Sequence, residues 1–181
     1  MKKILVMLAV TLCCTIISTV FTSCGGDDYN NSKNDTTPAA AVITYTLTSS
    51  KEMRDTFDLT IEYYDAEGKV QTEKMTGDTW TKEVTSKLPA TLGAHMKVQL
   101  NDGVDVSTVE TLPVCYGYDY NARVVDATGK FVIGNIIRNQ RPKYRLNTDR
   151  VSSFLETYSS GLANYIFVFD EKGKLTENHW Q

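Results

Sequence analysis

The chain contains few of the residues that carry most enzyme chemistry. Its 181 residues include only two histidines and four cysteines. Neither His95 nor His179 has another His or Cys at the spacing that a metal site requires. The sequence also lacks the G-x-S-x-G, H-E-x-x-H and phosphate-loop motifs. We therefore expect no enzyme activity, no metal and no cofactor.

The charge and the composition exclude further classes of protein. The chain has 19 Lys and Arg residues against 22 Asp and Glu residues, a formal charge of −3. A nucleic-acid-binding protein needs a basic face to neutralise phosphate, so we expect no nucleic-acid partner. Four cysteines are too few for a disulfide-dense scaffold. Hydrophobic residues at 41% and charged residues at 23% are ordinary for a globular domain and exclude wholesale disorder.

The N-terminus carries a targeting segment. Lys2 and Lys3 precede an apolar stretch that runs from Ile4 and ends in Phe21-Thr22-Ser23-Cys24. A stretch of this length nearly spans a bilayer, which takes about 20 apolar residues, so an uncleaved membrane anchor is one interpretation. The small residues before Cys24 favour a second interpretation, a cleaved signal peptide, because they suit a peptidase that cleaves in front of the cysteine.

These residues resemble the lipobox of bacterial lipoproteins. The resemblance implies that residues 1–23 are a signal peptide, that this peptide is removed, that the thiol of Cys24 takes a diacylglycerol, and that its new amino group is acylated. Fatty-acyl chains such as palmitate anchor a protein stably when several are present, because each buried CH₂ contributes about 0.8 kcal/mol.

The residues after the cysteine predict where the protein is displayed. Gly25-Gly26-Asp27-Asp28 resembles the export signal of surface lipoproteins in Bacteroidetes. This resemblance implies a lipid-anchored protein on the outer face of the outer membrane. The periplasmic face of that membrane and an ordinary cleaved secretory peptide are the alternatives.

A polar segment follows the anchor. From Tyr29 the chain is rich in Asn, Ser, Thr and Asp, so we expect residues 24–40 to form a flexible tether. Asp35-Thr36-Thr37 resembles the short motif that is glycosylated on Thr in exported Bacteroidetes proteins. A plain linker is the alternative.

From residue 41 the pattern is that of strands. Apolar and polar residues alternate over 42–48, 57–63 and 96–100, which is typical of half-buried strands. The form Asp-x-x-Gly-Lys-apolar occurs three times, beginning at Asp65, Asp126 and Asp170. Aspartate and glycine in this order are typical of hairpin turns. Calcium binding, the rival interpretation, needs more oxygens close together than each turn offers.

One helix is predicted among the strands, near residues 149–160. An apolar stripe at helical spacing consists of Val151, Phe154, Leu155 and Tyr158. Thr148 or Asp149 suits the start of this helix and Gly161 its end. We predict one mostly-β domain over residues 41–181, with nine or ten strands. The first choice is an antiparallel β-sandwich of immunoglobulin-like or related topology. A closed lipocalin-like barrel is the alternative.

Two features are candidates for binding a partner. Tyr116, Tyr118 and Tyr120 lie on one face if their segment is a strand. Their rings then suit stacking on sugars or a protein partner, and cross-strand packing is the alternative. Cys115, beside them in an apolar run, is expected to be a buried, unreactive thiol.

The second feature is a basic cluster over residues 138–145. If this segment is extended, Arg141, Lys143 and Arg145 share one of its faces. They suit an anionic ligand such as a lipid phosphate, an acidic glycan or a carboxylate-rich partner. The alternative is a solvated edge strand in which Pro142 and the charges prevent aggregation.

Three functions remain open from the sequence. The first is a non-catalytic surface module that binds a glycan or protein partner through an exposed patch. The second is a structural accessory subunit of an envelope complex, such as a nutrient-uptake or fimbria-like assembly. The third is a carrier of a small apolar ligand, which requires a barrel with an internal cavity.

Overall fold

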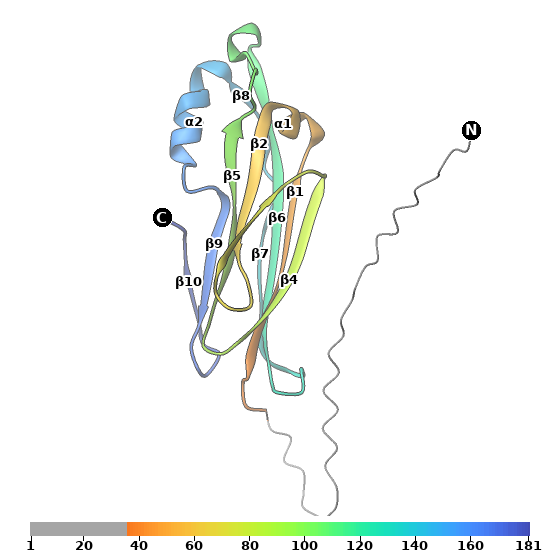
Figure 1. Cartoon of the computed structure of the whole chain (residues 1–181), viewed down its shortest axis with the longest axis vertical. Coiled ribbons are helices and arrows are strands. Elements are labelled where there is room, and N and C mark those ends of the chain that lie inside the picture. Colours follow the sequence, from red (N-terminus) through yellow and green to blue (C-terminus); the bar gives the residue numbers. More distant parts are fainter. Residues whose placement is uncertain (1–35) are drawn as a thin grey trace, which may run out of the picture. The chain divides into compact units, whose positions relative to one another are not determined.

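The computed structural model describes residues 36–181, apart from the side chain of Asn135. The predicted signal peptide, Cys24 and the tether up to residue 35 lie outside the described residues. The described chain forms two antiparallel sheets that pack face to face (Figure 1).

The first sheet has the order β4-β1-β6-β7, and β8 pairs with β6 next to β7. Its strands are β1 (Ala40–Ser49), β4 (Thr79–Lys87), β6 (Thr111–Val125), β7 (Phe131–Gln140) and β8 (Lys143–Asn147). The second sheet has the order β10-β9-β5-β2-β3. Its strands are β2 (Phe57–Tyr64), β3 (Val70–Lys74), β5 (Ala90–Leu100), β9 (Leu162–Phe169) and β10 (Leu175–Asn178).

This architecture confirms the prediction of an antiparallel β-sandwich. The lipocalin-like barrel is wrong, because no strand pairing joins the two sheets among the described residues. The core lies between the inner faces, where the alternating residues of β1 and β2 meet. Ile43, Tyr45 and Leu47 of β1 and Leu59 and Ile61 of β2 are all at most 1% exposed. Burying each such aliphatic side chain contributes about 1.5–3 kcal/mol.

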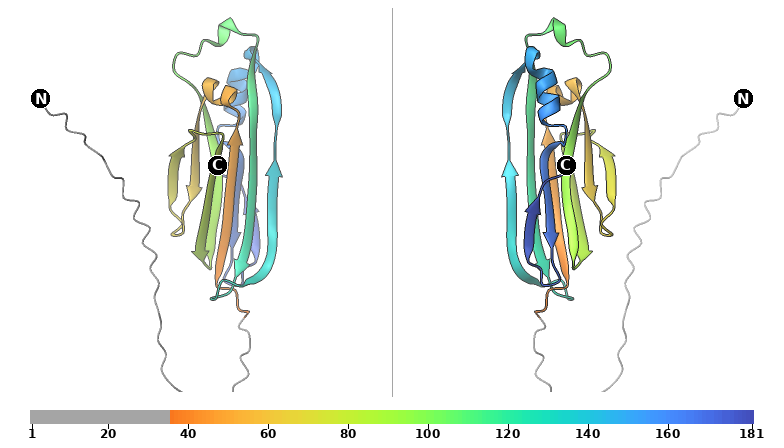
Figure 2. Two further views of the ribbon diagram at one scale, coloured as in Figure 1. Left: turned by 90° about the vertical axis from the view of Figure 1, so that its right-hand side faces the viewer. Right: turned by 90° about the vertical axis from the view of Figure 1, so that its left-hand side faces the viewer.

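Strand β6 organises the first sheet because it is long enough to pair with three strands. It pairs with β1 on one side and with β7 and then β8 on the other. Pro142 interrupts the edge between β7 and β8, since proline has no N–H for a ladder hydrogen bond. The pairing continues through the carbonyl of Pro142, which accepts from the N–H of Tyr116 at 3.2 Å. Figure 2 shows β7 and β8 as one interrupted edge strand.

The three Asp-x-x-Gly-Lys motifs form the predicted hairpin turns. In each turn the Asp Oδ1 accepts from the backbone N–H groups two and four residues later, at 2.8–2.9 Å. The glycines Gly68, Gly129 and Gly173 have φ values of 74°, 83° and 73°. Only glycine adopts such values without strain.

The predicted helix is present as α2 (Val151–Thr157). Val151 and Phe154 are buried against the core, and Gly161 follows with φ 94°. The expected cap by Thr148 or Asp149 is wrong, because these residues form a 3-10 turn ahead of the helix and no side chain caps either start.

A second helix, α1 (Lys51–Thr56), was not predicted. It carries the chain from β1 in the first sheet to β2 in the second, at the end of the sandwich opposite the start of β1 (Figure 1). The Ser50 side chain accepts from the N–H of Met53 at 3.2 Å. Met53 is the one buried residue of the helix, so a single apolar contact fixes it to the core.

A carboxylate links the two sheets at each open side of the sandwich. Glu73 of β3 accepts from Trp80 Nε1 at 2.7 Å and from Lys82 Nζ at 2.9 Å, both on β4. On the other side, Glu177 of β10 pairs with the guanidinium of Arg138 on β7. Edge strands of different sheets are thus joined by charged groups.

Within residues 36–181, no helix has the length and apolar character needed to cross a membrane.

Candidate functional site

The tyrosines proposed as a binding patch lie mostly in the core. Tyr118 is 5% exposed and Tyr120 is fully buried. The Tyr120 hydroxyl donates to the carbonyl of Ala163 at 2.9 Å, with the carbonyl of Ala94 at 3.3 Å. Burial raises the pKa of Tyr120 well above its usual value. Tyr118 and Tyr120 therefore cannot present their rings to a ligand, and the exposed patch is wrong for them.

The prediction that these tyrosines lie on one face of a strand was correct. The prediction that this face is turned to solvent was wrong for Tyr118 and Tyr120, which point into the core. A period of two defines two faces and does not say which one is covered. The polar ends of these tyrosines are satisfied inside the sandwich, near an irregularity in the β5–β9 pairing at Ala94. Tyr116 is only half-buried, and burial raises its pKa to about 12.

The predicted basic residues are brought together on the surface. Lys143 and Arg145 are exposed residues of β8, and they lie opposite Cys115 and Pro113 of β6. Arg145 Nε donates to the hydroxyl of Thr111 at 2.7 Å, which orients its guanidinium.

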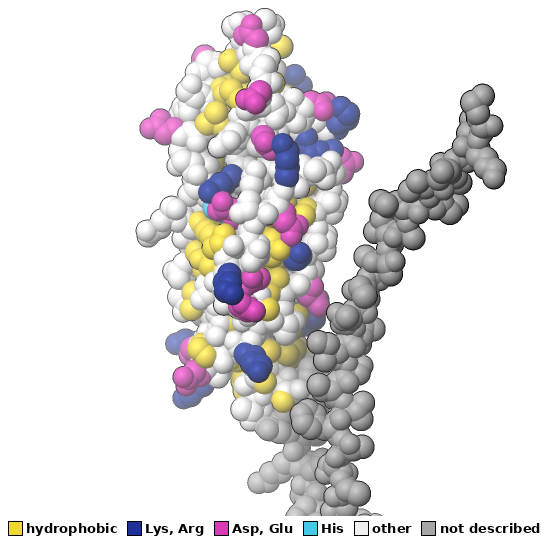
Figure 3. Space-filling model, in the orientation of Figure 1, with side chains coloured by type: hydrophobic (Ala, Val, Ile, Leu, Met, Phe, Trp, Pro, Cys, Tyr) yellow, Lys and Arg dark blue, Asp and Glu magenta, His cyan; other side chains and the backbone are white. Residues whose placement is uncertain are grey.

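A groove runs between these residues and helix α1. It consists of two adjoining hollows of about 550 and 600 Å³, which share Ser50, Glu52, Cys115 and Lys143. Its other lining residues are Thr48, Ser49, Lys51, Asp78, Thr79, Pro113, Tyr116, Arg141, Pro142, Tyr144 and Arg145. In Figure 3, Lys and Arg side chains lie among Asp and Glu side chains near the α1 end of the molecule. We call this feature the α1–β8 groove.

Arg141 reaches the groove because Gly117 lies beneath it. A Cβ at Gly117 would lie 3.3 Å from Arg141 Cγ and 2.6 Å from Thr48 Oγ1. The second distance is too short for real atoms, so a side chain here would force Thr48 or the sheet to move. The aliphatic stem of Arg141 therefore packs across β6 at a position where β6 has no side chain.

Four cations line the groove: Lys51 pairs with Asp55, and the other three have no acidic partner within residues 36–181. Eight Lys and Arg residues between 36 and 181 form ion pairs with carboxylates. Within this part of the chain, Arg141, Lys143 and Arg145 form none. Of the two acids that line the groove, Asp78 pairs with Arg54 and Glu52 has no ion pair in the described structure.

Cys115 lies in the floor of the groove. It is a free thiol, and it is partly exposed rather than fully buried as expected. The other three cysteines of the chain precede residue 36, so Cys115 is the only thiol of the sandwich.

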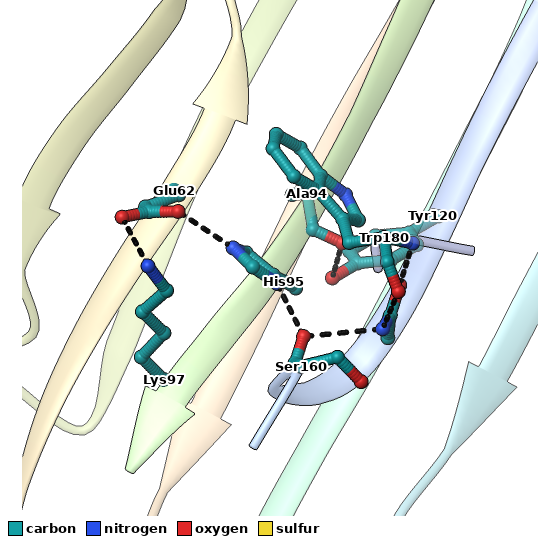
Figure 4. Close-up of polar contacts among 8 residues, drawn as sticks. Glu62, Ala94, His95, Lys97, Tyr120, Ser160 and Trp180 are labelled. Carbon is teal, nitrogen blue, oxygen red and sulfur yellow. Dashed lines mark hydrogen bonds and ion pairs between the residues drawn. The ribbon is translucent and has the colours of Figure 1, made fainter. Parts of the chain in front are cut away.

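The histidine with the most contacts, His95, is part of a closed cluster (Figure 4). Its Nε2 lies 2.9 Å from Glu62 Oε2, and its Nδ1 lies 2.5 Å from the carbonyl oxygen of Ser160. The Lys97 ammonium donates to the same carboxylate at 2.8 Å, and this contact is the main cause of the lowered pKa of Glu62. His95 is 3% exposed, and the ring of Trp180 stacks on it at 4.3 Å.

The C-terminal residues hold this cluster shut. The N–H of Trp180 donates to Asn164 Oδ1 at 2.6 Å, and Asn164 Nδ2 donates to the Trp180 carbonyl at 3.1 Å. His179 Nδ1 lies 2.5 Å from the Asn164 carbonyl oxygen. Both histidines therefore have structural contacts. In residues 36–181, no group of three His, Cys, Asp or Glu side chains is placed to hold a metal ion.

Comparison of the chain with protein-family models, with curated proteins and with solved structures finds no match. The site is therefore defined by its own geometry: a surface groove with unpaired cations at one end of an antiparallel β-sandwich.

Proposed function

We propose that this protein is a lipid-anchored binding module of the cell surface, which holds a glycan or protein partner in the α1–β8 groove. The observation that carries the proposal is the position of the groove. The chain enters the sandwich at Ala40, and β1 ends beside the groove at Ser49. A strand of this length spans about 33 Å, so the groove lies far from the tethered end.

The anchor in this proposal is Cys24. The lipobox-like residues before it and the acidic residues after it support acylation and display on the outer face of the outer membrane. The segment between Cys24 and the sandwich is rich in Asn, Ser, Thr and Asp, a composition that supports a flexible tether. The groove lies at the end of the sandwich opposite to the start of β1, so the attachment of the tether does not cover it.

A non-catalytic role is supported by the contacts of the candidate catalytic groups. Both ring nitrogens of His95 are engaged and its ring is covered by Trp180. The lining residues of the groove include cations, a thiol and the carboxylates of Glu52 and Asp78, and none of them is a histidine. We therefore propose recognition of a partner rather than its chemical conversion.

A structural subunit of an envelope assembly is the second candidate. The edge strand β7 exposes Phe131, Ile133 and Ile137, at 53%, 38% and 49%. An apolar edge strand is a typical place for a partner strand to add to a sheet. No comparable observation favours a carrier of a small apolar ligand, because large side chains such as Tyr45, Tyr120 and Phe167 fill the space between the sheets.

The thiol of Cys115 allows a direct test of the groove. Residues 34–181 form one compact unit and are applied to glycan arrays and to arrays of envelope proteins. One sample is unmodified, and the other carries a bulky maleimide on Cys115. We expect a bound partner that is lost after labelling.

The matched control carries Cys115→Ser and Lys172→Cys, which moves the label to a turn at the other end of the sandwich. This label is expected to leave binding intact. Binding that survives the label on Cys115, or no binding to either array, contradicts the proposal. For the anchor, mass spectrometry of the full chain from cells is expected to show an acylated N-terminal Cys24, and an intact Met1 contradicts it.

A further inference from the structure

We infer that the ligand of the α1–β8 groove is an anionic polysaccharide, bound through Arg141, Lys143 and Arg145. The inference rests on the proposed function and states the chemistry of its ligand. Carboxylate groups of uronic acids and sulfate groups are the two sources of the negative charge, and they share the same recognition by cations.

The positive charge of Arg141, Lys143 and Arg145 is not compensated by neighbouring carboxylates within residues 36–181. Of the 16 Lys and Arg residues between 36 and 181, eight pair with carboxylates. Among the unpaired residues of this part of the chain, Lys87, Lys130, Arg150, Lys172 and Lys174 lie outside the groove, and the other three gather in it. Arg141, Lys143 and Arg145 are adjacent, exposed and unpaired within residues 36–181. Like charges held side by side repel one another, and a bound polyanion removes this repulsion.

Neighbouring residues hold two of these cations in position. The hydroxyl of Thr111 fixes the guanidinium of Arg145. The gap at Gly117 lets the stem of Arg141 lie across the sheet. Lys143 and Arg145 lie two residues apart on one strand, which separates them by about 7 Å. Such a row matches a linear ligand that carries a charge on successive units better than a single small anion.

The floor and the rings of the groove suit a saccharide better than an acidic peptide. The floor of the groove is paired sheet, with Cys115 opposite Lys143 and Pro113 opposite Arg145. A ligand that lies on this face of the paired sheet meets side chains, and not the main-chain groups through which extended peptides add to a sheet edge. The rings of Pro113, Pro142 and Tyr144 beside the cations suit the apolar faces of sugars.

Substitutions of Glu52 and of the three cations are expected to change the affinity for a polyanion in opposite directions. Glu52 is the acid that lines both hollows, and it faces the same space as the cations. Neutralising it removes repulsion of a polyanion, whereas neutralising the cations removes attraction. We therefore expect Glu52→Gln to tighten binding and the change of Arg141, Lys143 and Arg145 to Gln to weaken it.

The experiment measures binding of residues 34–181 to polygalacturonate and to dextran sulfate by biolayer interferometry. Unmodified dextran is the uncharged probe and poly-glutamate is the peptide probe. We expect binding to one or both charged polysaccharides, at least about 10-fold weaker in the triple Gln variant. We also expect a fall in affinity as salt rises, because counterions screen the groove. The charged arm that binds more tightly identifies the source of the charge.

The matched control changes Lys172 and Lys174 to Gln, in the turn at the other end of the sandwich. It removes positive charge without touching the groove, so we expect unchanged affinity. Circular dichroism verifies that every variant keeps the strand spectrum.

Several results overturn the inference. They are equal binding of dextran and the charged polysaccharides, tighter binding of poly-glutamate, or equal losses in the triple and control variants. If a neutral or protein partner is nevertheless lost after labelling of Cys115, the proposed function stands and only the ligand class is wrong. If nothing binds in either experiment, the proposed function fails as well.

Discussion

Glu73 allows a quantitative test of how the sandwich is held closed. Its carboxylate accepts from Trp80 Nε1 at 2.7 Å, from the Tyr63 hydroxyl at 2.7 Å and from Lys82 Nζ at 2.9 Å. These contacts, with that of Trp80 the largest, lower the pKa of Glu73 from 4.5 to about 2. The carboxylate is therefore more stable in the folded chain than in the unfolded chain, and its contribution to stability depends on pH.

The sign follows from the direction of the shift. The folded pKa lies below the unfolded value, so the stabilisation is complete above about pH 4.5 and is lost as the pH falls towards 2. At 1.36 kcal/mol per pKa unit the upper limit is about 3 kcal/mol. The Glu73 side chain is 38% exposed, and solvent screening reduces this to about 1–2 kcal/mol.

The perturbation is Glu73→Gln, which keeps the shape of the side chain and removes its charge. Urea unfolding is followed by circular dichroism from pH 7 to pH 2. We expect the variant to be less stable by about 1–2 kcal/mol at pH 7, because its amide also places a donor against the Trp80 N–H. The difference should shrink as the pH approaches 2.

The control is Glu67→Gln, which removes a carboxylate that is 71% exposed and pairs with Lys69 in the β2–β3 turn. We expect this change to stay within about 0.5 kcal/mol at every pH. A loss in the Glu73 variant that is the same at pH 7 and pH 3 would refute the reasoning, because it would come from packing and not from the ionised carboxylate.

Three further substitutions test other parts of the structure. Tyr120→Phe keeps the buried ring but leaves two carbonyls without their donor, and we expect a loss of about 1–3 kcal/mol in urea unfolding; no change would show that water satisfies them. Trp180→Ala removes the ring stacked on His95. We expect the free energy of unfolding to fall by about 1–2 kcal/mol and backbone hydrogen exchange around His95 to become faster. Unaltered exchange would contradict the closed cluster. Gly117→Val places a side chain where Arg141 lies, so we expect several-fold weaker polysaccharide binding together with a lower thermal midpoint; unchanged affinity would show that the position of Arg141 is unimportant.

The local signals in the sequence predicted much of the fold. Alternation of apolar residues identified strands such as β1 and β2, because one face of each is covered by the other sheet. The repeated turn motif was readable because an aspartate and a glycine form each turn within a few residues. The stripe of Val151 and Phe154 predicted α2 for the same reason.

Features that depend on long-range contacts were not predictable. The inward side of β6 is decided by the second sheet, so Tyr118 and Tyr120 gave no local sign of burial. Helix α1 has only six residues, of which Met53 is buried. Its apolar pattern is therefore too short to predict a helix. The docking of Trp180 onto His95 joins residues that are far apart in the sequence.

The candidate site was only partly predictable. The segment that contains Arg141, Lys143 and Arg145 identified one wall of the groove, because all three lie within five residues. The opposite wall at Ser50 and Glu52 is nearly a hundred residues away in the chain. The sequence therefore indicated charge without indicating a groove.

The most direct test of the binding groove is a titration of isotope-labelled residues 34–181 with oligogalacturonate, followed by NMR chemical shifts of the backbone amides. The account predicts shifts that are concentrated at Ser50, Cys115 and the 141–145 segment, with none at the turn of residues 170–174. Shifts concentrated on the outer face of the second sheet, around Tyr64 and Trp180, would contradict it.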